Sequence, residues 1–220
     1  MARYQEPVVV IGLGRFGTSL ARELTHRGTE VLGIDSSDLI VQKLAGQLGR
    51  VVVADSTDID ALREIGLEGF DRAVVAIGTD QQSSILTTAV LSELGIKDIW
   101  AKALDHRHAR ILERVGAHHV VQPEHEIGER VAHLVSGQML DYIEVDKDWA
   151  IVKTQPPKFL VGIALGESRL REKYRVTVVS VKPEGKDDYT YAEAATILSY
   201  GDQILIVGRV SDVERFVDNI

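Results

Sequence analysis

The stretch Val8-Val9-Val10-Ile11-Gly12-Leu13-Gly14-Arg15-Phe16-Gly17 decides the fold of this chain. Its four apolar, mostly β-branched residues predict a buried strand, and the Gly-x-Gly-x-x-Gly that follows runs into a helical pattern with Leu20 and Leu24 on one face. A second apolar strand, Val31-Leu32-Gly33-Ile34, ends at Asp35, roughly 20 residues beyond the glycines. Strand, glycines, helix, strand and acid in this order are the fingerprint of a dinucleotide-binding fold.

Each part of the fingerprint has its own physical role. Gly12 permits the tight turn, Gly14 lets the backbone approach a phosphate, and Gly17 lets the helix pack close to the strand. The helix N-terminus offers free N–H groups and the positive end of its dipole to that phosphate. Asp35 can accept hydrogen bonds from both hydroxyls of an adenosine ribose and would repel a 2′-phosphate. We therefore expect a nucleotide other than NADP at this loop; the alternative is the same fold with an empty site.

The composition excludes several classes of function. Of the 220 residues 45% are hydrophobic and only 5% aromatic, which suits a parallel sheet buried on both faces. The net charge is −8 and no long basic run is present, so we expect no nucleic-acid partner. The absence of cysteine excludes disulfides and thiolate metal sites. Without a signal peptide or a membrane-length apolar run, we expect a cytoplasmic protein with no direct membrane insertion.

Apolar strands alternate with helical patterns through the first part of the chain. The further strands are expected at 50–55, 73–77, 99–103 and 119–121. This rhythm predicts an α/β fold with a Rossmann-like, doubly wound parallel sheet. Ligands bind beyond the carboxyl ends of such strands, and the glycine loop, Asp35, Asp55, Gly78 and Glu124 all fall on that edge.

The pattern changes after a crossover helix expected over Ile127 to Val135. The segment from Gly137 to Asp148 predicts a hinge and connection, and a last helix is expected after a cap at Ser211. The strands between them are shorter, at 150–153, 176–181 and 203–207. We therefore predict a nucleotide-binding domain with the crossover helix over 1–139 and a second, smaller α+β domain over 140–220.

Two classes of function remain open, a nucleotide-sensing binding module and an NAD-dependent oxidoreductase. Hydride transfer normally needs a substrate domain that supplies a general acid or base. All seven histidines lie at or before His133, so the second domain has none. The histidines between His106 and His125 have no specific metal-ligand spacing, which favours solvated or edge histidines over a metal site. The residues therefore favour a binding module that is not an enzyme.

Arg15 lies between the second and third glycines, at the phosphate end of the first helix. Backbone amides and the helix dipole already meet two phosphates, so an added guanidinium suits extra phosphate charge or a phosphate from a neighbouring subunit. We therefore favour ATP or ADP over NAD or NADH as the ligand. A solvated surface arginine is the alternative.

Several motifs together resemble an RCK (regulator of potassium conductance) domain. They are Gly-Leu-Gly-Arg-Phe-Gly at 12–17, Ile-Asp at 34–35, Ala-Asp-Ser-Thr-Asp at 54–58, Ala-Ile-Gly-Thr-Asp at 76–80, Trp-Ala-Lys-Ala at 100–103 and Gln-Pro-Glu at 122–124. Leu-Arg-Glu-Lys-Tyr at 170–174 resembles the C-terminal RCK subdomain. One nucleotide domain with one such subdomain is similar to the Ktr type of cytosolic subunit rather than to the doubled Trk type.

The resemblance implies a regulatory subunit of a potassium transport system. It implies a homo-oligomer, in which dimers assemble to an octameric ring that docks on a potassium-translocating membrane subunit. The ring would lie in the cytoplasm, peripheral on the inner face of the membrane through this partner. ATP and ADP would favour different ring shapes and so gate potassium uptake, and some members also bind NAD(H).

The resemblance also implies roles for single residues. The implied cofactor-binding residues are Gly12, Gly14, Arg15, Phe16, Gly17, Asp35, Asp55, Ser56, Ile77, Gly78 and Lys102. Among them the glycines and Arg15 would hold phosphates, Asp35 the ribose, and Lys102 would lie near the phosphates. Asp55 and Ser56 would lie near the adenine. Glu124 resembles the carboxylate that holds a divalent or monovalent cation between the nucleotides of paired subunits.

The small domain of some relatives binds cyclic di-AMP at a dimer interface, with an arginine that matches Arg171. This sequence departs from the pattern at Arg175, where relatives usually have glycine after Lys-Tyr. The loop that contains Gly185 and Asp187 also varies freely. Cyclic di-AMP therefore stays an open alternative as a ligand of the second domain.

Overall fold

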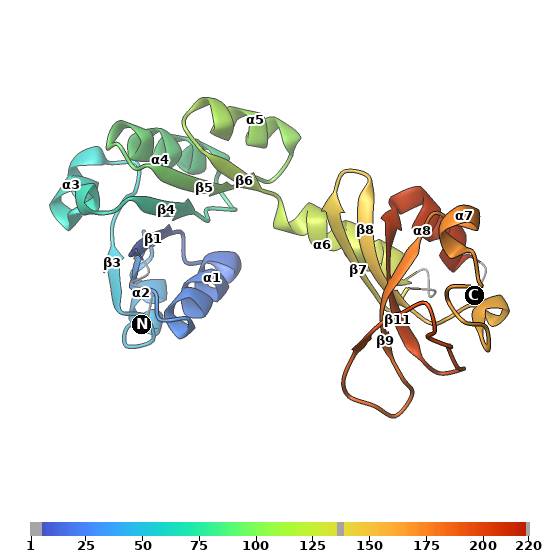
Figure 1. Ribbon diagram of the computed structural model, residues 1–220. Coiled ribbons are helices and arrows are strands. Elements are labelled where there is room, and N and C mark those ends of the chain that lie inside the picture. Colours follow the sequence, from blue (N-terminus) through green and yellow to red (C-terminus); the bar gives the residue numbers. More distant parts are fainter. Residues whose placement is uncertain (1–5, 136–138, 219–220) are drawn as a thin grey trace. The chain divides into compact units, whose positions relative to one another are not determined.

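The computed structural model describes residues 6–135 and 139–218 (Figure 1). The chain divides into two compact units, Met1–Glu124 and His125–Ile220. The helix α6 (Pro123–Val135) starts at this division. The predicted boundary after residue 139 assigns α6 to the first domain, whereas the compact units assign most of it to the second.

The first unit is built on a parallel sheet of six strands in the order β3-β2-β1-β4-β5-β6. The strands are β1 (Val8–Ile11), β2 (Val31–Asp35), β3 (Arg50–Val53), β4 (Arg72–Val75), β5 (Asp98–Lys102) and β6 (His119–Val121). Val8 pairs with Val31 on one side and with Arg72 on the other, so β1 is central and the chain winds outward from it in both directions. The predicted Rossmann-like, doubly wound sheet is confirmed.

Helices cover both faces of this sheet. They are α1 (Arg15–His26), α2 (Asp38–Leu44), α3 (Ile59–Ile65), α4 (Gln81–Glu93) and α5 (His106–Arg114), with a 3-10 turn at Leu67–Gly69. Figure 1 shows α1 and α2 on one side of the sheet and α4 and α5 on the other. Side chains of β1 alternate between the two resulting cores, with Val9 and Ile11 in one and Val8 and Val10 in the other. This burial on both faces is why the strand is a continuous apolar run.

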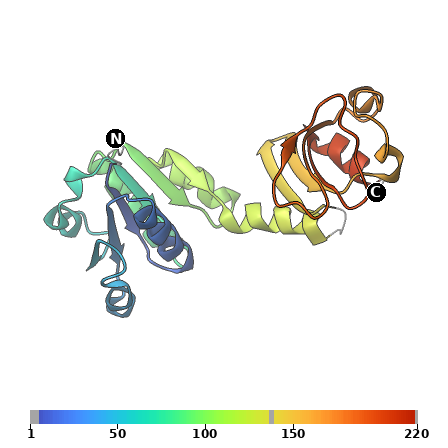
Figure 2. The same ribbon diagram turned by 60° about the horizontal axis from the view of Figure 1, so that its bottom comes forward.

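The second unit is a small α+β fold around an antiparallel sheet in the order β10-β9-β11-β8-β7. The strands are β7 (Asp141–Asp146), β8 (Trp149–Thr154), β9 (Thr177–Lys182), β10 (Thr190–Tyr191) and β11 (Gln203–Arg209). The helices are α6, α7 (Leu170–Lys173) and α8 (Val210–Val217), with a 3-10 turn at Lys158–Leu160. Phe216 of α8 is fully buried in the core with Val152 and Ile204, and Figure 2 shows α8 against the strands. The predicted α+β class is confirmed.

Two local predictions in this unit are wrong. Half of the segment interpreted as a hinge is the edge strand β7; Gly137 and the residue after it lie outside the described residues. The strand is hard to recognise because Ile143 and Val145 are exposed and two acids interrupt the apolar pattern. Ser211 does not cap the last helix, since α8 already begins at Val210.

Candidate functional site

The loop between β1 and α1 has the geometry that the three glycines predict. Gly12 has a φ of +87°, and a Cβ there would lie 3.0 Å from the backbone nitrogen of Ile77. A Cβ on Gly17 would overlap the carbonyl oxygen of Gly12. A Cβ on Gly14 meets no atom within 4 Å, so the space beside this residue is open. Gly12 and Gly17 are thus needed for packing, whereas Gly14 leaves room for a ligand to approach the backbone.

The N-terminus of α1 differs from those of the other long helices of this unit. Asp80 caps α4 and Asp105 caps α5, each by accepting hydrogen bonds from two N–H groups of the first turn. The cap residue of α1 is Gly14, which provides no side-chain hydrogen bond, and the first turn contains no acid. The free N–H groups and the helix dipole at this point favour an anion.

Asp35 lies at the end of β2 and holds the glycine loop in place. Its Oδ2 accepts a hydrogen bond from the backbone N–H of Leu13 at 2.7 Å, and its Oδ1 accepts one from Ser37 at 2.9 Å. A carboxylate offers about four acceptor positions, so both oxygens keep capacity for ribose hydroxyls. The structural bond to Leu13 was not predicted from the sequence.

Lys102 and Glu124 form an ion pair beside the glycine loop. Nζ of Lys102 donates to Oε1 of Glu124 at 2.6 Å, with the lysine side chain 8% exposed and the glutamate side chain 68% exposed. The same Nζ lies 5.6 Å from the ring centre of Phe16 and 3.1 Å from where a Cβ on Gly78 would sit. Phe16 of α1, Gly78 after β4 and Glu124 of α6 therefore surround the buried ammonium group of Lys102.

The electrostatics of this pair favour the charged form of Glu124. The hydrogen bond from Lys102 holds the pKa of Glu124 below its usual range, and the charges of Lys102 and Arg15 act in the same direction. A carboxylate stabilised by neighbouring cations stays ionised at neutral pH. The site therefore presents a carboxylate, an ammonium group and a guanidinium close to an uncapped helix N-terminus.

Asp55 and Ser56 follow β3, and their side chains contact other residues. Oδ1 of Asp55 accepts hydrogen bonds from the hydroxyl and the N–H of Thr57, which lower the pKa of this carboxyl. The buried hydroxyl of Ser56 lies 2.8 Å from that of Thr87 on α4. The N–H of Ala54 donates to the carbonyl of Asp35, so this strand end lies next to that of β2. The structure thus brings Asp55 close to Asp35 and engages the Ser56 hydroxyl inside the fold.

The histidines that cluster in sequence have separate surroundings in the structure. His108 is buried in α5, where its Nδ1 accepts a hydrogen bond from Leu104, and His119 stacks on Trp100. Over residues 6–135 and 139–218, no three His, Asp or Glu side chains gather closely enough to hold a metal ion. In the same residues, no helix combines the length and the apolar character that crossing a bilayer requires.

Comparison with known proteins identifies the family. The TrkA-N domain family matches residues 8–123, and the TrkA-C domain family matches residues 150–220. The chain is a TrkA-type RCK protein. The two matched segments correspond to the parallel sheet with its helices and to most of the antiparallel unit.

Sequence relatives of this RCK protein come from potassium uptake systems. It is 38% identical to Ktr system potassium uptake protein C of Bacillus subtilis over 94% of each chain. It is 34% identical to Ktr system potassium uptake protein A of the same organism over 94% of this chain and 93% of the relative. It is also 34% identical to protein A of Vibrio alginolyticus over 90% of each chain. All three relatives are potassium uptake proteins by name.

Solved structures show the same fold at low sequence identity. The GsuK RCK domain superposes with a TM-score of 0.66 at 18% identity, over all of this chain and 48% of the other. A GsuK channel bound to NAD superposes with a TM-score of 0.55 at 22% identity, over all of this chain and 39% of the other. The TrkA-N domain of the inner membrane protein ybaL from Escherichia coli superposes with a TM-score of 0.54 at 21% identity, over 59% of this chain and 96% of the other. The chain spans half or less of the GsuK chains.

Proposed function

We propose that this RCK protein is a cytosolic, nucleotide-sensing regulatory subunit that gates potassium uptake through a membrane ion-translocating partner. The observation that carries the proposal is the convergence of the glycine loop, Lys102 and Glu124 next to the start of α6. A phosphate bound at this point would contact Lys102, which holds Glu124 in the first turn of α6. The relatives from potassium uptake systems supply the process that is regulated.

The proposed ligand is ATP or ADP. The uncapped start of α1 and the buried Lys102 supply the positive charge for phosphates, and Asp35 supplies acceptors for the ribose. Arg15 adds a cation where a third phosphate would lie. NAD(H) is the rival ligand, because a GsuK channel structure contains NAD. Calorimetry with ATP, ADP and NADH tests the choice, and micromolar NADH binding without ATP or ADP binding would contradict it.

A cation at Glu124 belongs to the same proposal. The carboxylate is ionised at neutral pH and its side chain is 68% exposed, so one oxygen stays available beyond the bond to Lys102. Two such carboxylates from paired subunits, together with nucleotide phosphates, would form an all-oxygen environment of the kind that Mg²⁺ or Ca²⁺ prefers. Glu124→Gln is expected to remove any cation dependence of ATP binding.

Helix α6 supplies a surface for self-association. Its Ile127, Val131 and Val135 lie four residues apart and are 61%, 46% and 78% exposed, so one face of the helix is apolar and open. Leu134 and the ion pair of Arg130 with Asp141, next to this face, attach the helix to the rest of the second unit. A second copy of the chain would cover the apolar face, as the proposed dimers of an octameric ring require. The mass in solution with ATP and with ADP tests this assembly.

Gating follows when the two nucleotides favour different arrangements of the ring. A ligand shifts a conformational equilibrium only by its difference in affinity for the two states. Nucleotide phosphate competes with Glu124 for Lys102, so binding changes the contact that holds the first turn of α6. The test is potassium flux through the reconstituted complex with ATP and with ADP. Equal flux with both nucleotides, each shown to bind, would contradict gating.

The second unit contains a pocket that supports cyclic di-AMP as an additional ligand. Its volume is about 340 Å³, and Arg171, Arg169 and Thr177 contribute to its wall. Nε of Arg171 donates to the Thr177 hydroxyl at 3.1 Å, which leaves further guanidinium N–H groups for a phosphate. Calorimetry with cyclic di-AMP on the unmodified chain and on Arg171→Ala tests this site. Equal affinity for both would show that Arg171 has no part in it.

A further inference from the structure

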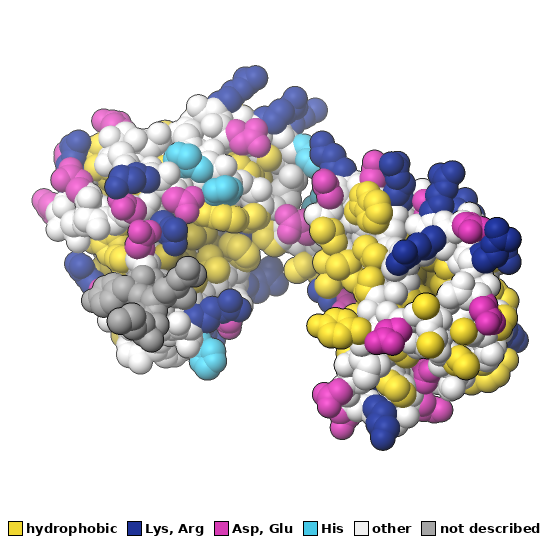
Figure 3. All heavy atoms as spheres, in the orientation of Figure 1, with side chains coloured by type: hydrophobic (Ala, Val, Ile, Leu, Met, Phe, Trp, Pro, Cys, Tyr) yellow, Lys and Arg dark blue, Asp and Glu magenta, His cyan; other side chains and the backbone are white. Residues whose placement is uncertain are grey.

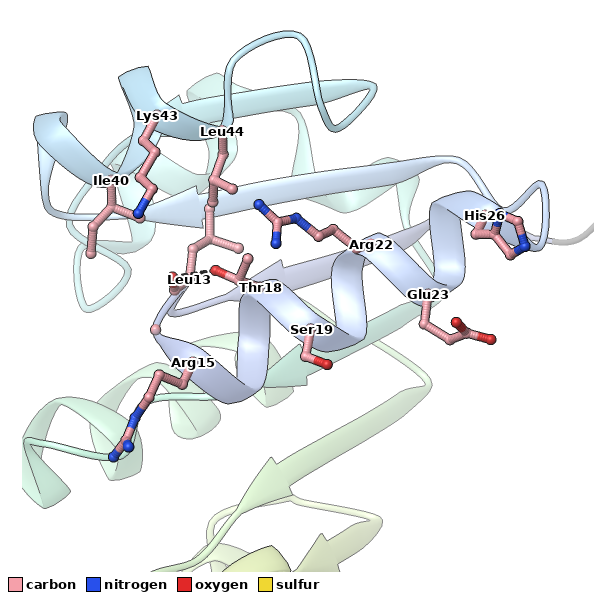
Figure 4. Close-up of a pocket in the computed structure, with 11 residues that line it drawn as sticks. Leu13, Arg15, Thr18, Ser19, Arg22, Glu23, His26, Ile40, Lys43 and Leu44 are labelled. Atoms are coloured by element: carbon pink, nitrogen blue, oxygen red, sulfur yellow. Dashed lines mark hydrogen bonds between the residues drawn. The ribbon is translucent and has the colours of Figure 1, made fainter.

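A groove of about 810 Å³ runs between α1 and α2 on the outer side of the first unit. Leu13, Ile40 and Leu44 lie at its apolar base, and polar side chains of both helices form its walls. Figure 4 shows Arg22 of α1 and Lys43 of α2 extending into this groove from the two helices. Arg15 also lines the groove, but Figure 4 shows its guanidinium directed away from those two cations.

The groove carries an excess of positive charge, although the chain as a whole is acidic. In the part of the chain that the structure describes, neither Arg22 nor Lys43 forms an ion pair with a carboxylate. Glu23, the acid that lines the groove, is held by Arg27 at 2.6 Å. The chain as a whole carries a net charge of −8, and Figure 3 shows acidic and basic side chains intermixed over one face. A local excess of positive charge steers acidic partners to this place.

Arg22 is also held in position. Its Nη2 donates to Oε1 of Gln47 at 2.6 Å, and Nε2 of Gln47 donates in turn to the carbonyl of Lys43 at 2.9 Å. The glutamine therefore links the two helices and fixes the guanidinium over the groove. A guanidinium has five N–H donors, so most of them stay available to a carboxylate. An arginine fixed in this way loses less conformational entropy on binding.

The groove borders the proposed nucleotide site at one end, where Leu13, Gly14 and Arg15 line it, and Arg22 and Lys43 lie farther along it. Arg22 lies seven residues beyond Arg15, about 10 Å along the helix at 1.5 Å per residue. Thr18 lies between them, and its hydroxyl donates a hydrogen bond to the carbonyl of Leu13. Beyond the glycine loop, a small anion would meet the two cationic side chains of Arg22 and Lys43. An extended occupant fits better, because α1 has 12 residues and is about 18 Å long.

We propose that the groove between α1 and α2 docks an acidic segment of the membrane ion-translocating subunit. Aspartate or glutamate side chains of that segment pair with Arg22 and Lys43, and an apolar residue between them covers Ile40. The inference rests on the proposed function, because it names the surface through which the regulatory chain reaches its partner. It predicts association that weakens as ionic strength rises.

The test is the affinity of the full chain for the purified potassium-translocating subunit in detergent. The double variant Arg22→Glu/Lys43→Glu is expected to bind at least roughly tenfold more weakly and with a smaller salt dependence. Lys158→Glu/Lys186→Glu in the second unit is the control with the same change of charge, and it is expected to bind like the unmodified chain. Gln47→Ala changes no charge and is expected to weaken binding a few-fold by releasing Arg22.

Nucleotide affinity and thermal unfolding of each variant show whether the first unit stays folded. Unchanged association of the folded double variant overturns the docking surface, and nucleotide-dependent flux then still supports the proposed function. Weakened association without any nucleotide effect on flux supports the docking surface and contradicts the proposed function. Tripolyphosphate serves as a second probe. If it binds in an Arg22- and Lys43-dependent way while association is unchanged, the groove is an anion site and the proposal is wrong.

Discussion

At the scale of single residues, Lys102 is the most constrained group of the candidate site. It is a buried lysine whose charge is balanced by one exposed carboxylate, that of Glu124. Breaking such a pair from the lysine side removes the main cause of the lowered pKa of Glu124. The pair is therefore best examined through the titration of the glutamate.

Lys102→Met is expected to raise the pKa of Glu124 toward its ordinary value. In the unmodified chain the pKa is depressed, so the stabilisation by the pair is present above the unfolded pKa of glutamate and is lost as the pH falls through the folded one. Carboxyl NMR titration measures the shift. Lys97→Met, which removes the exposed partner of Asp71, is the control and leaves Glu124 unchanged. An unchanged titration of Glu124 in Lys102→Met would show that the ion pair does not form.

The backbone of Arg175 is strained, because its φ is +57°, in the left-handed region. Glycine adopts this conformation without steric cost, whereas the Cβ of any other residue is strained there. Arg175→Gly is expected to stabilise the second unit by about 1 kcal/mol relative to Arg175→Ala, since alanine keeps the strain. Chemical unfolding followed by the fluorescence of Trp149 compares the two variants. Equal stability of glycine and alanine would mean that the loop relaxes without cost.

At the scale of elements, the glycine loop separates packing from ligand access. Gly17→Ala places a methyl group on the carbonyl oxygen of Gly12, so we expect both stability and nucleotide binding to fall. Gly14→Ala points into open space with a φ of −65°, so we expect unchanged stability but weaker nucleotide binding. Thermal unfolding and calorimetry measure the two effects. Gly28 also has a positive φ but lies far from the glycine loop, so Gly28→Ala is the control. We expect this variant to lose stability and to keep its affinity for nucleotide.

The elements also show what the sequence can predict. The parallel strands follow from continuous β-branched runs such as Val8–Ile11, because burial on both faces requires them. The edge strand β7 escapes prediction because only Tyr142 of it is buried, so no apolar period appears. The contact between Lys102 and Glu124 is also absent from the local pattern, since 22 residues separate them. The signal in the sequence is that Lys102 ends one strand and Glu124 follows the next by three residues, which places both at one edge of the parallel sheet.

At the scale of the whole molecule, regulation requires that ATP and ADP have different effects on the assembly. The two ligands differ by one phosphate, and the charge of Arg15 acts on the exposed Glu124 in addition to that of Lys102. Under the proposed function, a third phosphate would add negative charge between these two residues. It would strengthen the attraction to Arg15 and increase the repulsion of Glu124 unless a cation intervenes. The first turn of α6 would carry this change toward the face that we propose a second copy covers.

Arg15→Ala is therefore expected to reduce the difference between ATP and ADP more than it reduces the affinity for ADP. The loss of one partly exposed cation should cost about 1 kcal/mol of ATP affinity, a factor of roughly five, and less for ADP. Potassium flux through the reconstituted complex is measured with each nucleotide, alongside both dissociation constants. Arg63→Ala, in an exposed ion pair on α3, is the control and keeps the full difference. If Arg15→Ala also keeps the full difference in flux, charge at this position does not distinguish the nucleotides, and the distinction must arise from the cation at Glu124 alone.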